Sequence, residues 1–270
     1  MLILTPSDCS LAPADGPTTE VTWVRSGDGR YAQEHGSCAA SLLPVEAEVV
    51  LALPVRSLSW HRLAVPKVAA SRLRAVLDGL LEERVLGDTA DLHFALEPGG
   101  RAGQTVWVAV CQKAWLQSWL TALESAGRPV SRIVPTLWPT SAGRNSPDET
   151  VHWAHDEGDR VWLATANPLG VRCIPLRESG SSTFGASSFG ASTFGESSFG
   201  GGGPEASVTH HLLDGSDPSS THWFADPSIT ALAEQVCNQR FDLMPPHDWL
   251  LRCTQSEWNL AQFDLSLSSG

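Results

Sequence analysis

Few residues of this 270-residue chain have the types and spacing that enzymatic chemistry requires. A phosphate-binding loop needs several glycines at a helix start, commonly followed by a lysine, and the two lysines, Lys67 and Lys113, follow no such loop. The chain has no G-x-S-x-G nucleophile elbow, and none of its cysteines has a recognisable catalytic context. The sequence therefore predicts neither a phosphate-binding loop nor a catalytic nucleophile.

Histidines are the next candidates, as metal ligands. His152 and His155 are three residues apart in a strand-like stretch, a spacing that sends their side chains to opposite faces. His210 and His211 adjoin a low-complexity tract and are expected to be solvated. The cysteine and carboxylate positions complete no zinc-type ligand set. The sequence therefore predicts no metal site.

Two short charged stretches carry alternative interpretations. One is an acidic turn that could supply a carboxylate pair but is more typical of a solvated hairpin tip: Asp156, Glu157 and Asp159. The other ends the first predicted helix and is either a solvated helix face or a docking patch for a protein partner: Glu82, Glu83 and Arg84. If the docking interpretation holds, charge reversal at Glu82 and Glu83 should weaken partner binding.

The elements that position these residues follow from apolar patterning. In the first half we expect a hairpin at 20–37, strands at 48–55 and 58–66, a helix at 71–86, strands at 91–98 and 104–111, a helix at 113–129 and a strand at 130–135. The strands at 48–55 and 58–66 are predicted to lie side by side in a central sheet. The pattern indicates an α/β fold with mixed sheets.

A polar, proline-containing stretch at 139–148 predicts the boundary of a second lobe. An antiparallel meander is expected there, at 150–155, 159–166 and 170–176, followed by a helix at 228–239. Between them, four Phe-Gly pairs in a five-residue repeat predict a disordered Ser/Phe/Gly loop over 178–206. The expected domains are 1–138, with an inserted subdomain, and 149–265.

Composition excludes several classes of protein. A net charge of −12 argues against a nucleic-acid binder, because such proteins need clustered positive charge. The six cysteines form no close pair, which is typical of thiols in a reducing cytoplasm. The N-terminus lacks a signal-peptide pattern, and no apolar run approaches the roughly 20 residues that span a bilayer.

Several stretches resemble one family. They are "VVLALPVRSLSWHRLAVP", "LRAVLDGLLEERVLGDTADLHFAL", "WVAVCQKAWLQSWLTALESAGRPVSRIVP" and "WNLAQFDLS". Together they are similar to the cytoplasmic part of the L component of the bacterial type II secretion system, the GspL family. The similarity is strong over residues 48–138 and recurs near 258–265.

The resemblance implies an actin-like ATPase fold of two ribonuclease-H-like lobes with a degenerate nucleotide site. Active members of that superfamily carry a D-x-G-x-x-x-[ST] hairpin in each lobe, and neither "RSGDGR" nor "HDEGDR" keeps that pattern. It further implies a location on the cytoplasmic side of the inner membrane. Residues 266–270 would then begin a juxtamembrane segment, with the transmembrane helix outside this chain.

The implied function is a scaffold that recruits the secretion ATPase and couples it to the pseudopilus assembly platform, with no enzymatic activity and no cofactor of its own. The implied partners are the N-terminal domain of the ATPase (the E component), the M and F components of the platform, and a second copy of the chain. The alternative is an active actin-like protein that binds and hydrolyses ATP. Binding of the ATPase favours the first hypothesis, and saturable binding of ATP with magnesium favours the second.

Overall fold

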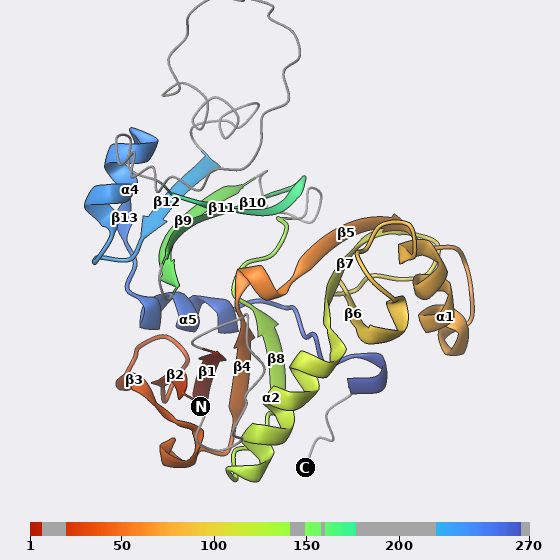
Figure 1. The fold of residues 1–270 in the computed structure, drawn as a ribbon, viewed down its shortest axis with the longest axis horizontal. Coiled ribbons are helices and arrows are strands. Elements are labelled where there is room, and N and C mark those ends of the chain that lie inside the picture. The colour runs from red at the N-terminus through yellow and green to blue at the C-terminus, as the bar shows by residue number, and fades with distance from the viewer. Residues whose placement is uncertain (7–19, 141–148, 158–159, 177–219, 266–270) are drawn as a thin grey trace, which may run out of the picture.

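A computed structural model describes residues 1–6, 20–140, 149–157, 160–176 and 220–265 of the chain (Figure 1). The described residues form three β-sheets with helices packed on them. Several predicted features fall wholly or partly outside these residues: the boundary stretch 139–148, the start of the strand at 159–166 with Asp159, the Ser/Phe/Gly tract, His210, His211 and the segment 266–270.

The first sheet has the strand order β3-β2-β1-β4-β8. Its strands are β1 (Leu2–Pro6), β2 (Glu20–Arg25), β3 (Glu34–Ala39), β4 (Val49–Leu53) and β8 (Arg132–Pro135). β1, β2 and β3 are antiparallel neighbours, whereas β4 and β8 run parallel to β1. The hairpin predicted at 20–37 is confirmed, and all five residues of β4 are buried, as expected of a central strand. Sequence patterning missed β1.

The chain leaves this sheet after β4 and builds a separate three-stranded sheet of order β5-β7-β6. These strands are β5 (Ser59–Ala64), β6 (Leu92–Leu96) and β7 (Thr105–Gln112), with the 3-10 helix η4 (Thr89–Asp91) before β6. The prediction that residues 58–66 lie beside 48–55 in one sheet is therefore wrong. Pro54 and the 3-10 helix η3 (Val55–Ser57) redirect the chain between the two strands, and an apolar run identifies a strand without identifying its neighbour.

Helix α1 (Ala70–Leu81) packs on the three-stranded sheet. Its buried stripe includes Leu77 and Leu81, as the 3.6-residue periodicity predicts. The helix ends at Leu81 rather than at residue 86, and a short turn leads to Gly87, whose φ of +101° favours glycine. The turn 82–84 therefore lies beyond the helix.

Helix α2 (Lys113–Ser125) brings the chain back to β8. Leu116, Trp119 and Leu123 are buried in the core beneath the first sheet. The helix ends where Gly127, at a φ of +72°, donates to Glu124 and Arg128 donates to Leu123, a Schellman-type cap. The helix predicted at 113–129 is thus confirmed, with its end at Ser125.

The second five-stranded sheet has the order β11-β10-β9-β12-β13. Its strands are β9 (Thr150–Glu157), β10 (Arg160–Asn167), β11 (Gly170–Pro175), β12 (Thr221–Ala225) and β13 (Asp242–Leu243), and helix α4 (Thr230–Cys237) packs on one face. The meander is antiparallel, and β12 and β13 run parallel to β9. Both five-stranded sheets thus share one strand order and one set of directions, so the predicted α/β fold with ribonuclease-H-like, actin-like lobes is confirmed.

Helix α5 (Pro246–Thr254) lies between the two five-stranded sheets in Figure 1. It contacts β1, β2, β4 and β8, while Trp249 stacks on Trp153 of β9 at 4.3 Å between ring centroids. Its proline at the first turn is compatible with a helix start. The sequence analysis did not predict this helix, which joins the cores of the two sheets.

The last described residues return to the first sheet and to the three-stranded sheet. Leu260 donates its N–H to Ile133 of β8, and Gln262 bonds both the N–H and the carbonyl of Leu96 in β6. The 3-10 helix η7 (Phe263–Leu265) follows. The predicted domain 149–265 thus includes residues that pack on sheets of the first half, and the boundaries at 138 and 149 stay a prediction. Within the described residues, no helix is both long and apolar enough to cross a bilayer.

Candidate functional site

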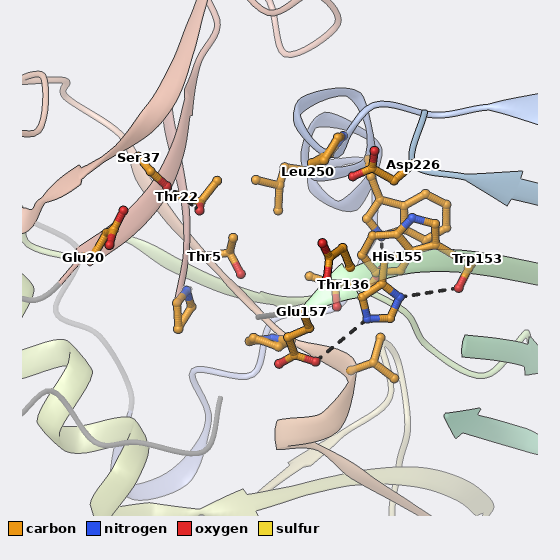
Figure 2. A pocket seen from close by; sticks show the side chains of 16 residues that line it. Thr5, Glu20, Thr22, Ser37, Thr136, Trp153, His155, Glu157, Asp226 and Leu250 are labelled. Carbon is orange, nitrogen blue, oxygen red and sulfur yellow. Dashed lines mark hydrogen bonds and ion pairs between the residues drawn. The ribbon is translucent and has the colours of Figure 1, made fainter. Parts of the chain in front are cut away.

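A cleft of about 420 Å³ lies between the two five-stranded sheets (Figure 2). Thr5, Glu20, Thr22 and Ser37 approach it from the first sheet, and Trp153, His155 and Glu157 approach it from β9. Pro6, Thr136, Glu157 and Asp226 lie at or just after the carboxyl ends of β1, β8, β9 and β12. In open α/β sheets this edge is where ligands bind, so the cleft is the expected place for a nucleotide.

The charge of the cleft does not suit a polyphosphate. The described residues that line it include four carboxylates and no lysine or arginine: Glu20, Asp156, Glu157 and Asp226. A triphosphate is favoured by positive charge or by convergent backbone N–H groups, whereas carboxylates that line the same cleft disfavour its negative charge. Within the described part of the chain, no three His, Cys, Asp or Glu side chains are grouped so as to hold a metal ion.

The turns of "RSGDGR" and "HDEGDR" do not occupy equivalent positions in the two five-stranded sheets. The turn of "HDEGDR" joins β9 to β10, the first two strands of the second sheet. The "RSGDGR" turn instead joins β2 to β3, and the position equivalent to "HDEGDR" is the β1–β2 connection. The misassignment arose because β1 was not predicted. That connection, residues 7–19, lies outside the described residues, as do residues 158 and 159.

Glu157 is not the solvated hairpin tip that the sequence suggested. Its side chain is 12% exposed, and one carboxylate oxygen lies 3.4 Å from Arg56. Arg56 belongs to η3, just after β4, and its guanidinium lies over the ring of Trp162 in β10 at 4.2 Å. The Glu157–Arg56 pair therefore links the carboxyl ends of β4 and β9 beside the cleft, which Glu157 lines and Arg56 does not. Nothing in the spacing of the two residues indicated this contact.

An aromatic stack forms the wall on the β9 side. His155 stacks on Trp153 at 4.1 Å, and Trp153 stacks in turn on Trp249 of α5. Burial lowers the pKa of His155, while Glu157, 4.0 Å away, raises it; burial is the larger influence. The imidazole is therefore neutral near pH 7 and does not offset the carboxylates of the cleft.

His152 lies on the opposite face of β9, as the strand periodicity predicted. It is fully buried, its Nδ1 pairs with the Thr165 hydroxyl at 2.8 Å, and its ring stacks on Trp223 at 3.7 Å. Burial lowers its pKa from the ordinary value of 6.5 to about 4. The side chain is thus a neutral member of the core.

This buried imidazole predicts a pH-dependent stability. His152 takes up a proton near pH 6.5 in the unfolded chain but only near pH 4 in the folded chain. The stability that comes from its neutral form is therefore fully present above pH 6.5 and is lost as the pH falls towards 4. The loss should approach roughly 1.4 kcal/mol per pH unit within that window. Urea unfolding at several pH values should show a smaller acid loss for His152→Gln than for wild type. Equal curves for wild type and His152→Gln would contradict the assignment.

The structure places the predicted docking residues away from the cleft. Glu82, Glu83 and Arg84 are exposed in the turn after α1, and Arg84 donates to the carbonyl of Arg62 at 3.3 Å. Arg84 also lines a second pocket of about 330 Å³, together with Arg56 and His61. Sequence reasoning missed these two residues. Their only signal was that they are two of the three basic side chains, with Arg62, in the largely apolar stretch 53–66.

Comparison with known proteins confirms the resemblance drawn from the residues. Residues 18–139 match the family described as type II secretion system (T2SS), protein L. The type II secretion system protein L of Dickeya chrysanthemi is 36% identical over 94 residues, which cover 35% of this chain and 23% of that protein. The protein L of Pseudomonas aeruginosa is 35% identical over 119 residues, which cover 44% of this chain and 30% of that protein. The matched segment thus spans less than a third of either relative.

One solved structure shares the fold along nearly the whole chain. The cytoplasmic domain of EpsL, an inner membrane component of the type II secretion system of Vibrio cholerae, superimposes with a TM-score of 0.56. The superposition covers 98% of this chain and 100% of that domain, at 15% sequence identity. The fold is therefore common to both, although the sequences have diverged.

Proposed function

We propose that this chain, which resembles type II secretion system protein L over residues 18–139, is the cytoplasmic scaffold that recruits the secretion ATPase. In this proposal it acts at the cytoplasmic side of the inner membrane, couples the ATPase to the pseudopilus assembly platform and performs no catalysis. Its partners are the ATPase N-terminal domain, the M and F components and a second copy of the chain. The observation that carries the proposal is the family match.

Two features of the structure support a binding role over a catalytic one. The cleft between the sheets has the position of a nucleotide site but is lined by four carboxylates and, among the described residues, no lysine or arginine. The Glu157–Arg56 pair, beside that cleft, ties β9 of the second sheet to η3, which follows β4 of the first sheet. Such a protein can hold its partner-binding surfaces at fixed positions without binding a triphosphate.

Recruitment predicts direct binding to the cognate secretion ATPase. Calorimetric titration of this chain with the full-length ATPase should give saturable binding in the low-micromolar range or tighter. The exposed turn carrying Glu82, Glu83 and Arg84 is proposed to contribute to the contact. No binding in that concentration range would overturn the recruitment function.

The second candidate function is ATP binding and hydrolysis, which the two ribonuclease-H-like sheets facing a cleft favour. Equilibrium dialysis with ATP and magnesium separates the candidates. The scaffold proposal expects no saturable binding, because the described residues of the cleft include no lysine or arginine for the phosphates and no ligand group that could hold magnesium. Saturable binding that is lost when the cleft is blocked by Thr5→Trp would favour the hydrolase instead.

A further inference from the structure

A second pocket, of about 330 Å³, lies at the edge of the three-stranded sheet. Its walls come from η3, the start of β5, the turn after α1 and the ends of β6 and β7. The pocket is thus built largely from the subdomain that contains the predicted docking turn. It is separate from the cleft between the five-stranded sheets, and the two pockets share no lining residue.

The charge of this pocket is opposite to that of the chain. Its described lining residues include three basic side chains and no carboxylate: Arg56, His61 and Arg84. The whole chain, by contrast, carries a net charge of −12. Arg56 is paired with Glu157, and burial lowers the pKa of His61, so Arg84 supplies the positive charge that attracts an anionic partner group to this pocket.

Arg84 and His61 are the basic groups best placed to receive such a group. Arg84 is exposed and donates a hydrogen bond to the carbonyl of Arg62. Nε2 of His61 lies 3.1 Å from the Ser59 hydroxyl. His61 and Arg84 line the same pocket, and burial, and next the positive charge of Arg84, lower the pKa of His61. A carboxylate between them would pair with Arg84 and favour protonation of His61.

The rim of the pocket adds an apolar feature. Leu86 is 96% exposed, while the neighbouring lining residues Leu92 and Val110 are buried. Because Leu86 is exposed at the rim of the pocket, an apolar side chain of a partner can pack against it. The pocket therefore combines bases for carboxylates with an apolar contact at its edge.

We infer that this pocket binds an acidic segment of the protein partner, in which carboxylate side chains flank an apolar residue. Arg84 and His61 bind the carboxylates, and Leu86 packs against the apolar residue. The inference rests on the proposed recruitment function, since the secretion ATPase is the partner in question. It also reverses the effect on binding that is expected of charge substitutions in the docking turn, because Arg84 rather than Glu82 or Glu83 makes the favourable contact.

The test is calorimetric titration of the full-length cognate ATPase with wild-type and variant chains at low ionic strength. Arg84→Glu and His61→Glu should each weaken binding by about 10-fold or more, the scale of a lost interfacial charge pair. Arg84→Gln should weaken it less, and Arg84→Lys should retain most of the affinity. Added salt should weaken the wild-type complex more than the Arg84→Glu complex.

Arg72→Glu is the matched control. Arg72 is exposed near the start of α1 and does not line the pocket, so this variant makes the same charge change elsewhere on the subdomain. Its affinity should stay within about 2-fold of wild type, as expected for a charge outside the contact. Circular dichroism confirms folding, and Arg84→Gln replaces Arg84→Glu if the latter unfolds.

Lysine substitution of Glu82 and Glu83 separates the two docking hypotheses. An acidic partner segment predicts unchanged or tighter binding, whereas a basic partner predicts weaker binding. Wild-type affinity in both Arg84→Glu and His61→Glu, or weaker binding on Glu82→Lys and Glu83→Lys alone, would overturn the pocket inference and leave recruitment standing. A wild-type chain that fails to bind the ATPase would overturn the recruitment function itself.

Discussion

Trp249→Ala should lower the free energy of unfolding by roughly 3–5 kcal/mol, the range for truncating a fully buried tryptophan. Trp249 is 1% exposed, stacks on Trp153 of the second sheet and donates its indole N–H to the carbonyl of Thr136, beyond β8, at 3.0 Å. One side chain thus fills the core between the two five-stranded sheets. Urea unfolding followed by circular dichroism measures the loss.

Two companion variants sharpen this prediction. Trp249→Phe keeps an aromatic ring but loses the N–H donor, so its loss should lie between those of wild type and Trp249→Ala. Trp162→Ala removes a tryptophan that is only partly buried and should cost less than Trp249→Ala. If Trp249→Ala cost no more than Trp162→Ala, α5 would not be the element that joins the two sheets.

Arg132→Met should destabilise the chain by about 2–4 kcal/mol and loosen its C-terminal segment. The guanidinium of Arg132 in β8 donates to the carbonyls of Thr254, Ser256 and Trp258, which fixes the turn out of α5. Methionine fills a similar volume but leaves these part-buried acceptors without their donor. Limited proteolysis should therefore cut within 255–265 sooner in the variant than in wild type.

Arg30→Met is the control for charge, because Arg30 is exposed in the β2–β3 turn. It should change neither the unfolding free energy beyond about 0.5 kcal/mol nor the rate of cleavage. The segment 255–265 has further contacts, including a 2.7 Å contact between His93 and the Leu260 carbonyl and the two hydrogen bonds between the Gln262 side chain and the Leu96 backbone. Unchanged proteolysis in Arg132→Met would show that these contacts hold the segment by themselves.

The two pockets have opposite charges, and this difference supports distinct roles. The cleft between the five-stranded sheets carries Glu20, Asp156, Glu157 and Asp226, whereas the pocket beside α1 carries Arg56, His61 and Arg84. Arg56 lines the second pocket and also pairs with Glu157 at the first. A substitution at Arg56 would therefore alter both sites, which is why Arg84 and His61 are the cleaner positions for testing docking.

Local patterns in the sequence determined the elements whose neighbours along the chain are also their neighbours in space. The 20–37 hairpin, the meander of β9, β10 and β11 and the helices α1 and α2 were all predicted, because apolar periodicity and turn glycines act over a few residues. The ribonuclease-H-like fold was inferred by resemblance, and the shared strand order of the two sheets confirms it.

Only the tertiary structure decided which distant segments meet. It placed β5 in a separate sheet from β4, put the unpredicted α5 between the two lobes, and returned residues 258–265 to β6 and β8. It also paired Glu157 with Arg56 and brought His61 to Arg84. Side-chain burial and charge pairing across long chain separations depend on the packed arrangement, and residue spacing along one sequence carries no record of them.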